Sequence, residues 1–179
     1  RGRHPYDVSK SCADLIARMY HATYGLPVAV ARSGNIYGGG DLNWDRLIPG
    51  TIRSLWRNER PVVRSDGAFK RDYVYVRDAV DAYLALAEAL DRPEIRGECF
   101  NFGPGEPRAV LEVVEQLRRL MGKIALEPDI RNEARDEIRE QSLSASKARR
   151  LLGWTPRHAF EDGLKATIAW YERFLREAP

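Results

Sequence analysis

Residues 5–40 decide the fold, and they read PYDVSKSCADLIARMYHATYGLPVAVARSGNIYGGG. Apolar side chains recur at helical spacing from Tyr6 to about Tyr24, and the GLP that follows ends the helix. The run VAVAR at 28–32 is short, apolar and β-branched, which predicts a buried strand. A glycine-rich loop, SGNIYGGGDLNW, is expected after it. A long helix that leads into a buried strand favours an α/β fold.

The same alternation of helix and strand continues through the rest of the chain. Hydrophobic periodicity predicts helices at 47–58, 77–90, 109–122, 144–153 and 159–175, and strands at 61–64, 71–76, 98–103 and 123–128. The fourth of these helices is expected to begin at an N-cap serine, Ser144, and to end at Gly153. Residues 129–141 are too polar to predict any element. The sequence therefore indicates one α/β unit over residues 1–179, whose polar segments serve a site.

The composition is that of an ordinary globular chain. Its 179 residues are 44% hydrophobic, which is enough for one sizeable core. The 29 basic residues are interleaved with 26 acidic ones, so the net charge of +3 indicates a mixed surface and disfavours a nucleic-acid partner. No apolar run approaches the roughly 20 residues that span a bilayer, so we expect no membrane partner.

The two cysteines, Cys12 and Cys99, lie far apart in the sequence and match no metal-ligand spacing. We therefore expect no metal site and two reduced, buried thiols. Reduced thiols, together with the lack of a secretory leader pattern, favour a cytoplasmic protein.

Tyr6 and Lys10 are the first candidate catalytic pair. Residues four apart lie one above the other on a helix face, so the ammonium group of Lys10 can lie beside the phenol of Tyr6. A nearby positive charge favours the phenolate, which is the form that a general base needs. The same spacing also arises by chance, so the pair alone decides nothing.

The context of this pair carries a family resemblance. PYDVSKSCAD, VAVARSGNIYGGGD and RDYVYVRDAVDAY follow one another in order, and SLSASKARRLLGW and GLKATIAWY come near the end. Together these motifs resemble the extended short-chain dehydrogenase/reductase family, which contains the nucleotide-sugar epimerases and dehydratases. The stretch GNIYGGGDLNWDRLIPGTIRS is most similar to the CDP-glucose 4,6-dehydratase branch of that family.

The resemblance implies a Rossmann-like fold with a smaller substrate-binding lobe, an NAD cofactor and a nucleotide-sugar substrate, CDP-glucose by the motif above. Tyr6 would remove the proton of the sugar 4-hydroxyl, and Lys10 would hold the ribose of NAD, so both residues are also cofactor-binding candidates. In a 4,6-dehydratase, water is then lost across C5 and C6 and the hydride returns to C6. A 4-epimerase uses the same two residues and returns the hydride to C4 on the other face. A third possibility is a non-catalytic fragment that binds nucleotide sugars.

Three further residues are substrate-binding candidates by resemblance. Asn35 resembles the family asparagine that contacts the substrate phosphates, and Arg71 resembles the arginine that pairs with the diphosphate. Arg135, with Arg139 as its competitor, would lie against the nucleotide. Asp78 opens the helix after Tyr75, where a capping role competes with a substrate role.

The family's glycine-rich dinucleotide-binding turn has no match in this sequence, and GPGEP at 103–107 is expected to be a simple loop. The resemblance therefore implies that the chain is the C-terminal part of a longer fold whose N-terminal dinucleotide-binding half is absent. Such a fragment is expected to be inactive alone. We also expect a homodimer, with self-association through the 6–24 helix and the 28–32 strand.

Overall fold

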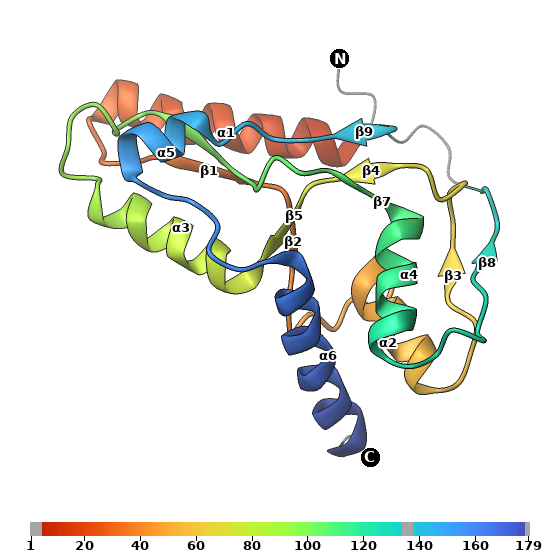
Figure 1. The fold of residues 1–179 in the computed structure, drawn as a ribbon. Helices are drawn as coiled ribbons and strands as arrows, with labels where there is room; N and C mark the ends of the chain where they lie inside the picture. Colours follow the sequence, from red (N-terminus) through yellow and green to blue (C-terminus); the bar gives the residue numbers. More distant parts are fainter. Residues whose placement is uncertain (1–4, 134–137, 178–179) are drawn as a thin grey trace.

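The computed structural model describes residues 5–133 and 138–177, which form an α/β structure (Figure 1). Its helices are α1 (Pro5–Tyr24), α2 (Leu47–Trp56), α3 (Val76–Glu88), α4 (Val110–Leu120), α5 (Ser146–Leu152) and α6 (Phe160–Glu177). Its strands are β1 (Val30–Ser33), β2 (Asn35–Tyr37), β3 (Val62–Val63), β4 (Lys70–Arg71), β5 (Tyr73–Tyr75), β6 (Cys99–Phe102), β7 (Arg108–Ala109), β8 (Asp129–Ile130) and β9 (Glu140–Gln141).

The strands pair mostly in parallel. β1 pairs with β6, β2 with β5 and β3 with β8, all parallel, while β4 is antiparallel to β7 and parallel to β9. Parallel pairs need crossover connections, and helices between the strands provide several of them. The β-structure is therefore short-stranded and held in place by the helices that pack on it.

The chain changes strand partner at Gly34, between β1 and β2. The amide of Gly34 donates to the carbonyl oxygen of Phe102 at 3.0 Å, and the next amide, that of Asn35, donates to the carbonyl oxygen of Asp72 at 2.7 Å. A Cβ atom on Gly34 would lie 2.6 Å from that Asp72 oxygen, so only glycine fits without a shift of the backbone. This crossing places Asn35 at the start of β2.

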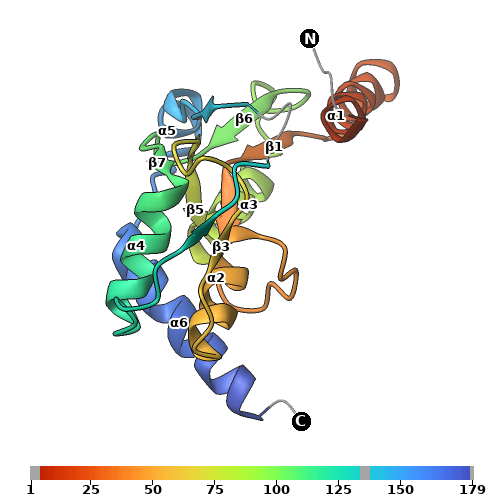
Figure 2. The same ribbon diagram turned by 90° about the vertical axis from the view of Figure 1, so that its right-hand side faces the viewer.

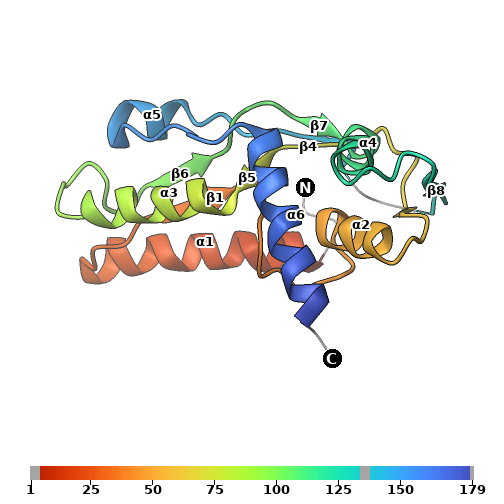
Figure 3. The ribbon, with the colours of Figure 1, turned by 60° about the horizontal axis from the view of Figure 1, so that its bottom comes forward.

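Two hydrophobic cores hold the molecule together. The first lies among α2, α4, α6 and the β2–β5 pair, and includes Ile52, Leu55, Leu117 and Tyr171. The second joins α3 and α5 to the β1–β6 pair through Phe100, Phe102 and Trp154, among others. Figure 3 shows α3, α5 and β6 on one side and α2, α4 and β8 on the other, with α6 between them.

Helix α1 lies at the margin of the molecule, beside β1 and away from α4 and α6 (Figure 2). It buries no residue among those described. Its apolar side chains at Leu15, Ile16, Met19 and Tyr20 are instead exposed. The helix periodicity predicted from the sequence is confirmed, but the apolar face covers no core within this chain.

Most predicted helices are confirmed to within a few residues, but several details are wrong. Residues 123–128 form turns rather than a strand, because Gly122 ends α4 in the left-handed region at φ +66° and the amide of Lys123 donates back to the carbonyl oxygen of Arg118. The predicted glycine-rich loop contains β2, and the polar stretch 129–141 contains β8 and β9.

Two predictions about single side chains are also wrong. Ser144 is not an N-cap: helix α5 begins after Ala145, and the Ser144 hydroxyl donates to the hydroxyl of Ser146 at 3.2 Å. The thiols are not buried, since Cys12 is exposed and Cys99 is half-buried. Gly153 does end α5 at φ +66°, as predicted.

Candidate active site

A cavity of about 1120 Å³ opens between α1 and the strands β1 and β2; we call it the α1–β1 cleft. Tyr6, Lys10 and Asp14 line it from α1, and Arg32 and Asn35 line it from the strands. The cleft also reaches the start of α2, Tyr73 on β5 and Gln141 on β9. Segments distant in sequence therefore contribute to a single concave surface, which is the usual form of a small-molecule site.

Tyr6 and Lys10 lie side by side on the wall of this cleft, as their spacing predicts. The Nζ atom of Lys10 is 5.4 Å from the centroid of the Tyr6 ring. Tyr6 is 62% exposed, so its phenol is accessible to a ligand in the cleft. A cation close to an accessible phenol can stabilise the phenolate and hold anionic or hydroxylated groups.

Asp14 connects α1 to the strands. Its carboxylate forms an ion pair with Arg32 on β1, and its Oδ1 atom accepts a hydrogen bond from the Sγ–H of Cys99 on β6 at 3.1 Å. Burial opposes ionisation, but the hydrogen bonds from Cys99 and Arg32 prevail and hold the pKa of the Asp14 carboxyl below its usual value. The sequence interpretation missed this residue, although it lies four residues beyond Lys10 on the same helix stripe.

Asn35 lies exposed at the start of β2 and lines the cleft. Two backbone interactions fix its position: β2 pairs with β5, and the backbone amide of Asn35 donates to the backbone carbonyl oxygen of Asp72. The structure thus brings Asn35 to the same cleft as Tyr6 and Lys10.

Arg71 is not among the residues that line this cleft. Its Nη1 atom donates to the carbonyl oxygen of Lys70 at 2.9 Å, and its guanidinium lies 5.7 Å from the centroid of the Phe69 ring. On the neighbouring strand, Gln141 pairs in register with Arg71 and does line the cleft. Arg71 is therefore one strand away from the cleft wall.

Arg135 lies outside the described residues. Its competitor Arg139 is highly exposed, and its Nη2 atom is 3.8 Å from the carboxylate of Asp66. The structure does not place Arg139 on the cleft wall either.

Asp72 connects three segments behind the cleft. Its buried carboxylate accepts hydrogen bonds from the amides of Gly105 and Leu143, each at 3.2 Å, through the same oxygen. The other oxygen, Oδ1, has no hydrogen-bond partner among the described residues. Burial outweighs the hydrogen bonds and raises the pKa of this carboxyl above its usual value. GPGEP is a loop, as predicted, and Asp72 holds it in place.

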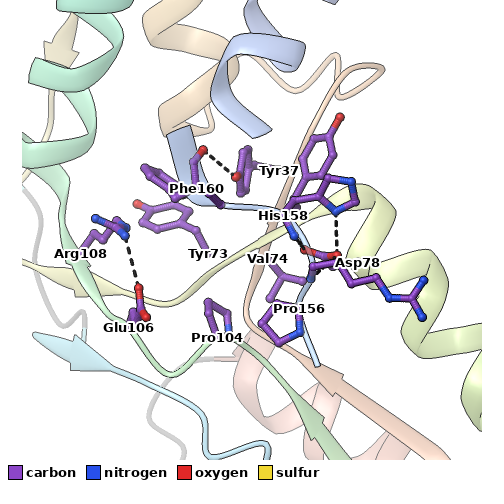
Figure 4. A pocket seen from close by; sticks show the side chains of 13 residues that line it. Tyr37, Tyr73, Val74, Asp78, Pro104, Glu106, Arg108, Pro156, His158 and Phe160 are labelled. Carbon is purple, nitrogen blue, oxygen red and sulfur yellow. Dashed lines mark hydrogen bonds and ion pairs between the residues drawn. The ribbon is translucent and has the colours of Figure 1, made fainter. Parts of the chain in front are cut away.

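Asp78 faces a second, smaller cavity of about 360 Å³, shown in Figure 4. Its buried carboxylate accepts hydrogen bonds from the amides of Arg157 and His158 and pairs with Nδ1 of His158 at 2.8 Å. The Nε1–H of Trp154 donates to the Asp78 carbonyl oxygen at 3.1 Å. Asp78 thus anchors the segment between α5 and α6. It lies in the first turn of α3, as predicted, but its carboxylate binds the amides of Arg157 and His158 and does not cap the helix.

Tyr37 and Tyr73 line both cavities. The hydroxyl of Tyr37 donates to the carbonyl oxygen of Phe160 at 3.1 Å (Figure 4). Burial raises the pKa of Tyr73 to about 12, so this phenol stays protonated at neutral pH. Both rings are buried in the first core, so these tyrosines serve as packing residues between the cavities.

Residues 1–103 match the family described as "NAD dependent epimerase/dehydratase family". The chain belongs to this family. The motifs that carry the resemblance in the sequence, Tyr6 and Lys10 included, fall mainly within this span.

Similar curated proteins include 4,6-dehydratases with two different nucleotides. The dTDP-glucose 4,6-dehydratase of Haemophilus influenzae is 32% identical over 93% of this chain and 51% of its own length. The CDP-glucose 4,6-dehydratase of Salmonella typhimurium is 30% identical over 98% of this chain and 52% of its own length. The chain spans about half the length of these relatives.

Solved structures confirm the Rossmann-like α/β fold. A dTDP-glucose 4,6-dehydratase from Bacillus anthracis, in complex with NAD, matches 99% of this chain and 55% of its own with a TM-score of 0.86 and 30% identity. A UDP-glucose 4-epimerase from Thermotoga maritima, with UDP-glucose, matches 96% of this chain and 54% of its own with the same TM-score and 28% identity.

Two features are absent from the described part of the chain. No helix in residues 5–133 or 138–177 has the length and apolar character to cross a membrane. In the same part of the chain, no three His, Cys, Asp or Glu side chains are grouped so as to hold a metal ion.

Proposed function

We propose that this chain supplies the Tyr–Lys side of the active site of an NAD-dependent nucleotide-sugar 4,6-dehydratase. The observation that carries the proposal is the presence of Tyr6, Lys10 and Asn35 on the wall of one cleft, in a chain of the epimerase/dehydratase family. The cleft is larger than the ~300–1,000 Å³ of typical small-molecule sites, so it has room for a sugar and a nicotinamide together.

In this proposal, the Tyr6 phenolate accepts the proton of the sugar 4-hydroxyl. NAD, when bound, supplies the hydride acceptor for C4. Lys10 donates hydrogen bonds to ribose hydroxyls and stabilises the phenolate, for which its three N–H donors and its position beside the Tyr6 ring are suited. The resulting 4-keto group acidifies C5–H, and this permits the loss of water across C5 and C6. The hydride taken from C4 then returns to C6 and a proton to C5, which gives the 4-keto-6-deoxy product.

The substrate of this reaction would be held through its phosphates. The side-chain amide of Asn35, which lies on the cleft wall, can donate a hydrogen bond to a phosphate oxygen. Arg71 would act from β4 if its guanidinium leaves the Lys70 carbonyl for a diphosphate, whose charge makes it the stronger acceptor. Arg135 is proposed to contact the nucleotide.

CDP-glucose is the proposed substrate, on the strength of the motif GNIYGGGDLNWDRLIPGTIRS. The relatives named above act on dTDP-glucose or CDP-glucose, by their names, at nearly equal identity to this chain. The choice of nucleotide therefore rests on the motif. A cytoplasmic location is proposed as well, since Cys12 and Cys99 are both free thiols.

The two cores support two structural parts with different roles within the single unit 1–179. We assign the core around β1 and β6 to the Rossmann-like part and the core around α2, α4 and α6 to the nucleotide-sugar-binding lobe. The α1–β1 cleft includes residues from both cores, since Ala31 and Ile48 line it.

A 4-epimerase is the second candidate, because the Thermotoga maritima UDP-glucose 4-epimerase fits this chain with the same TM-score as the dehydratase. The two reactions differ in the product, not in the need for Tyr6. A chain that binds nucleotide sugars without turnover is the third candidate.

The test is product analysis with the complete protein that contains this sequence, supplied with NAD and with CDP-, dTDP- or UDP-glucose. We expect a 4-keto-6-deoxy product, formed fastest from CDP-glucose. Tyr6→Phe should abolish turnover, while Tyr20→Phe, a matched change on the same helix outside the cleft, should leave it intact. A 4-epimer that retains its 6-hydroxyl would establish the epimerase instead.

A further inference from the structure

Three residues of α1 form one stripe along the cleft. Tyr6, Lys10 and Asp14 are spaced four apart and all line the α1–β1 cleft. Lys10 is therefore one turn from a phenol on one side and one turn from a carboxylate on the other. A lysine in this position can turn its ammonium towards either neighbour.

In the structure, Lys10 lies over the Tyr6 ring and not against Asp14. Within residues 5–133 and 138–177, the Asp14 carboxylate is occupied by Arg32 from β1 and by the thiol of Cys99 from β6, and no ion pair joins it to Lys10. The Asp14 side chain is only 17% exposed, so a pairing cation matters more to it than to a carboxylate in open solvent.

We infer that Arg32 is a positioning residue: its ion pair with Asp14 prevents that carboxylate from attracting Lys10 away from Tyr6. This inference rests on the proposed role of Tyr6 as general base. No role for Arg32 is predicted from the sequence.

The charges around the stripe support the assignment. Hydrogen bonding to Asp14 raises the pKa of Arg32, and the bonds described above lower that of Asp14, so both stay charged through the neutral range. Arg18, one turn beyond Asp14, donates from Nε to the carbonyl oxygen of Gly97 at 3.4 Å. Among the residues that the structure describes, the other titratable groups on the cleft wall are Asp7, Tyr37, Asp41, Arg46, Tyr73 and Tyr83.

Of these groups, Asp41 and Arg46 pair with each other at 3.0 Å, so neither competes for Lys10. Asp7 lies three residues before Lys10, towards the N-terminal end of α1, where Tyr6 also lies. Asp14 is therefore the carboxylate that can draw Lys10 towards the C-terminal end of α1, away from Tyr6, and its ion pair with Arg32 opposes this.

The test is the pH dependence of kcat in the complete protein with NAD and CDP-glucose, for Arg32→Gln, Asp14→Asn and the double variant. In Arg32→Gln, Lys10 should turn to Asp14, and the acidic limb of the profile should move up by on the order of one pH unit. Asp14→Asn should leave the limb in place, and adding it to Arg32→Gln should restore the limb.

This pattern separates positioning from stability. A purely structural ion pair would make both single variants lose activity alike, without moving the limb, and that result would overturn the inference. Arg32→Lys, which keeps the charge, should retain the wild-type limb. Arg131→Gln removes a similarly exposed arginine that pairs with Asp129 at 3.0 Å, and serves as the control without effect.

Failure of the proposed function gives a different result. If Tyr6→Phe turns over as fast as wild type, the base assignment is wrong and the limb has another origin. If Tyr6→Phe is inactive and the limb of Arg32→Gln is unmoved, the base assignment stands and only the positioning role is wrong.

Discussion

At the scale of single residues, the sequence could predict what depends on local geometry. Tyr6 and Lys10 lie together because four residues make about one helical turn, which needs no knowledge of the rest of the fold. The Asp14–Arg32 pair requires the helix to be docked on β1, and the hydrogen bonds of Asp72 require two loops to converge on it. Tertiary contacts of this kind leave no periodic signal in the sequence.

Asp72 gives a pH-dependent prediction at this scale. Its folded-state pKa lies above the usual value of 3.8, so its contribution to stability is fully present below about pH 3.8 and is lost as pH rises through the folded-state pKa. Asp72→Asn keeps an oxygen acceptor for Gly105 and Leu143 but carries no charge. We expect the free energy of unfolding of this variant, compared with that of wild type, to increase between about pH 3.5 and about pH 7.

Urea denaturation of both proteins at the two pH values measures this difference. Asp72→Ala is the matched control, because it removes the acceptor and should destabilise the fold by about 1–3 kcal/mol. A relative stability of Asp72→Asn that falls as pH rises would show that the carboxylate is stabilised, not strained, by its surroundings.

Gly34 gives a second residue-scale prediction. Because a Cβ atom would lie 2.6 Å from the Asp72 carbonyl oxygen, Gly34→Ala should destabilise the fold by about 1–3 kcal/mol through overpacking. Gly122→Ala, where a Cβ atom meets nothing within 4 Å, should cost only the ~1–2 kcal/mol of a left-handed alanine. Thermal unfolding of the two variants compares them, and a Gly34→Ala protein as stable as wild type would contradict the close crossing.

At the scale of elements, helices were easier to predict than strands. The long helices carry their periodicity in the sequence, so α1, α2, α3, α4 and α6 were predicted almost to their ends. β2 was missed because a glycine precedes it and three follow it. Residues 123–128 have the composition of a strand. Instead, Leu126 packs on the first core and the Arg118 guanidinium donates a hydrogen bond to the carbonyl oxygen of Ile124, so the segment forms turns.

The exposed apolar face of α1 leads to a prediction about this element. Apolar side chains gathered on one helix face are usually covered by a partner, and we expect a second copy of the protein to cover them. Ile16→Glu should then shift the protein towards monomer in analytical ultracentrifugation.

Ile124→Glu is the matched control for that prediction, because it changes an isoleucine of similar exposure in the turn after α4. It should leave the association state unchanged. A wild-type protein that sediments as a monomer at every concentration would contradict the prediction.

At the scale of the whole molecule, the family, the α/β fold and the cleft are consistent with one another. The crossing of the chain at Gly34 connects the two cores, and the α1–β1 cleft brings Tyr6 and Lys10 opposite Asn35. The sequence predicted these three residues as one site, while Arg71 lies one strand from the wall. Its side chain rests on a neighbouring carbonyl, and such a local contact has no signature in the sequence.

The measurement that tests the central claim most directly is mass spectrometry of the product formed from CDP-glucose and NAD by the complete protein, with and without Tyr6→Phe. The account predicts a nucleotide sugar that has lost one water and gained a 4-keto group, formed by the wild type and not by Tyr6→Phe. A product of unchanged mass, or equal turnover by Tyr6→Phe, would contradict it.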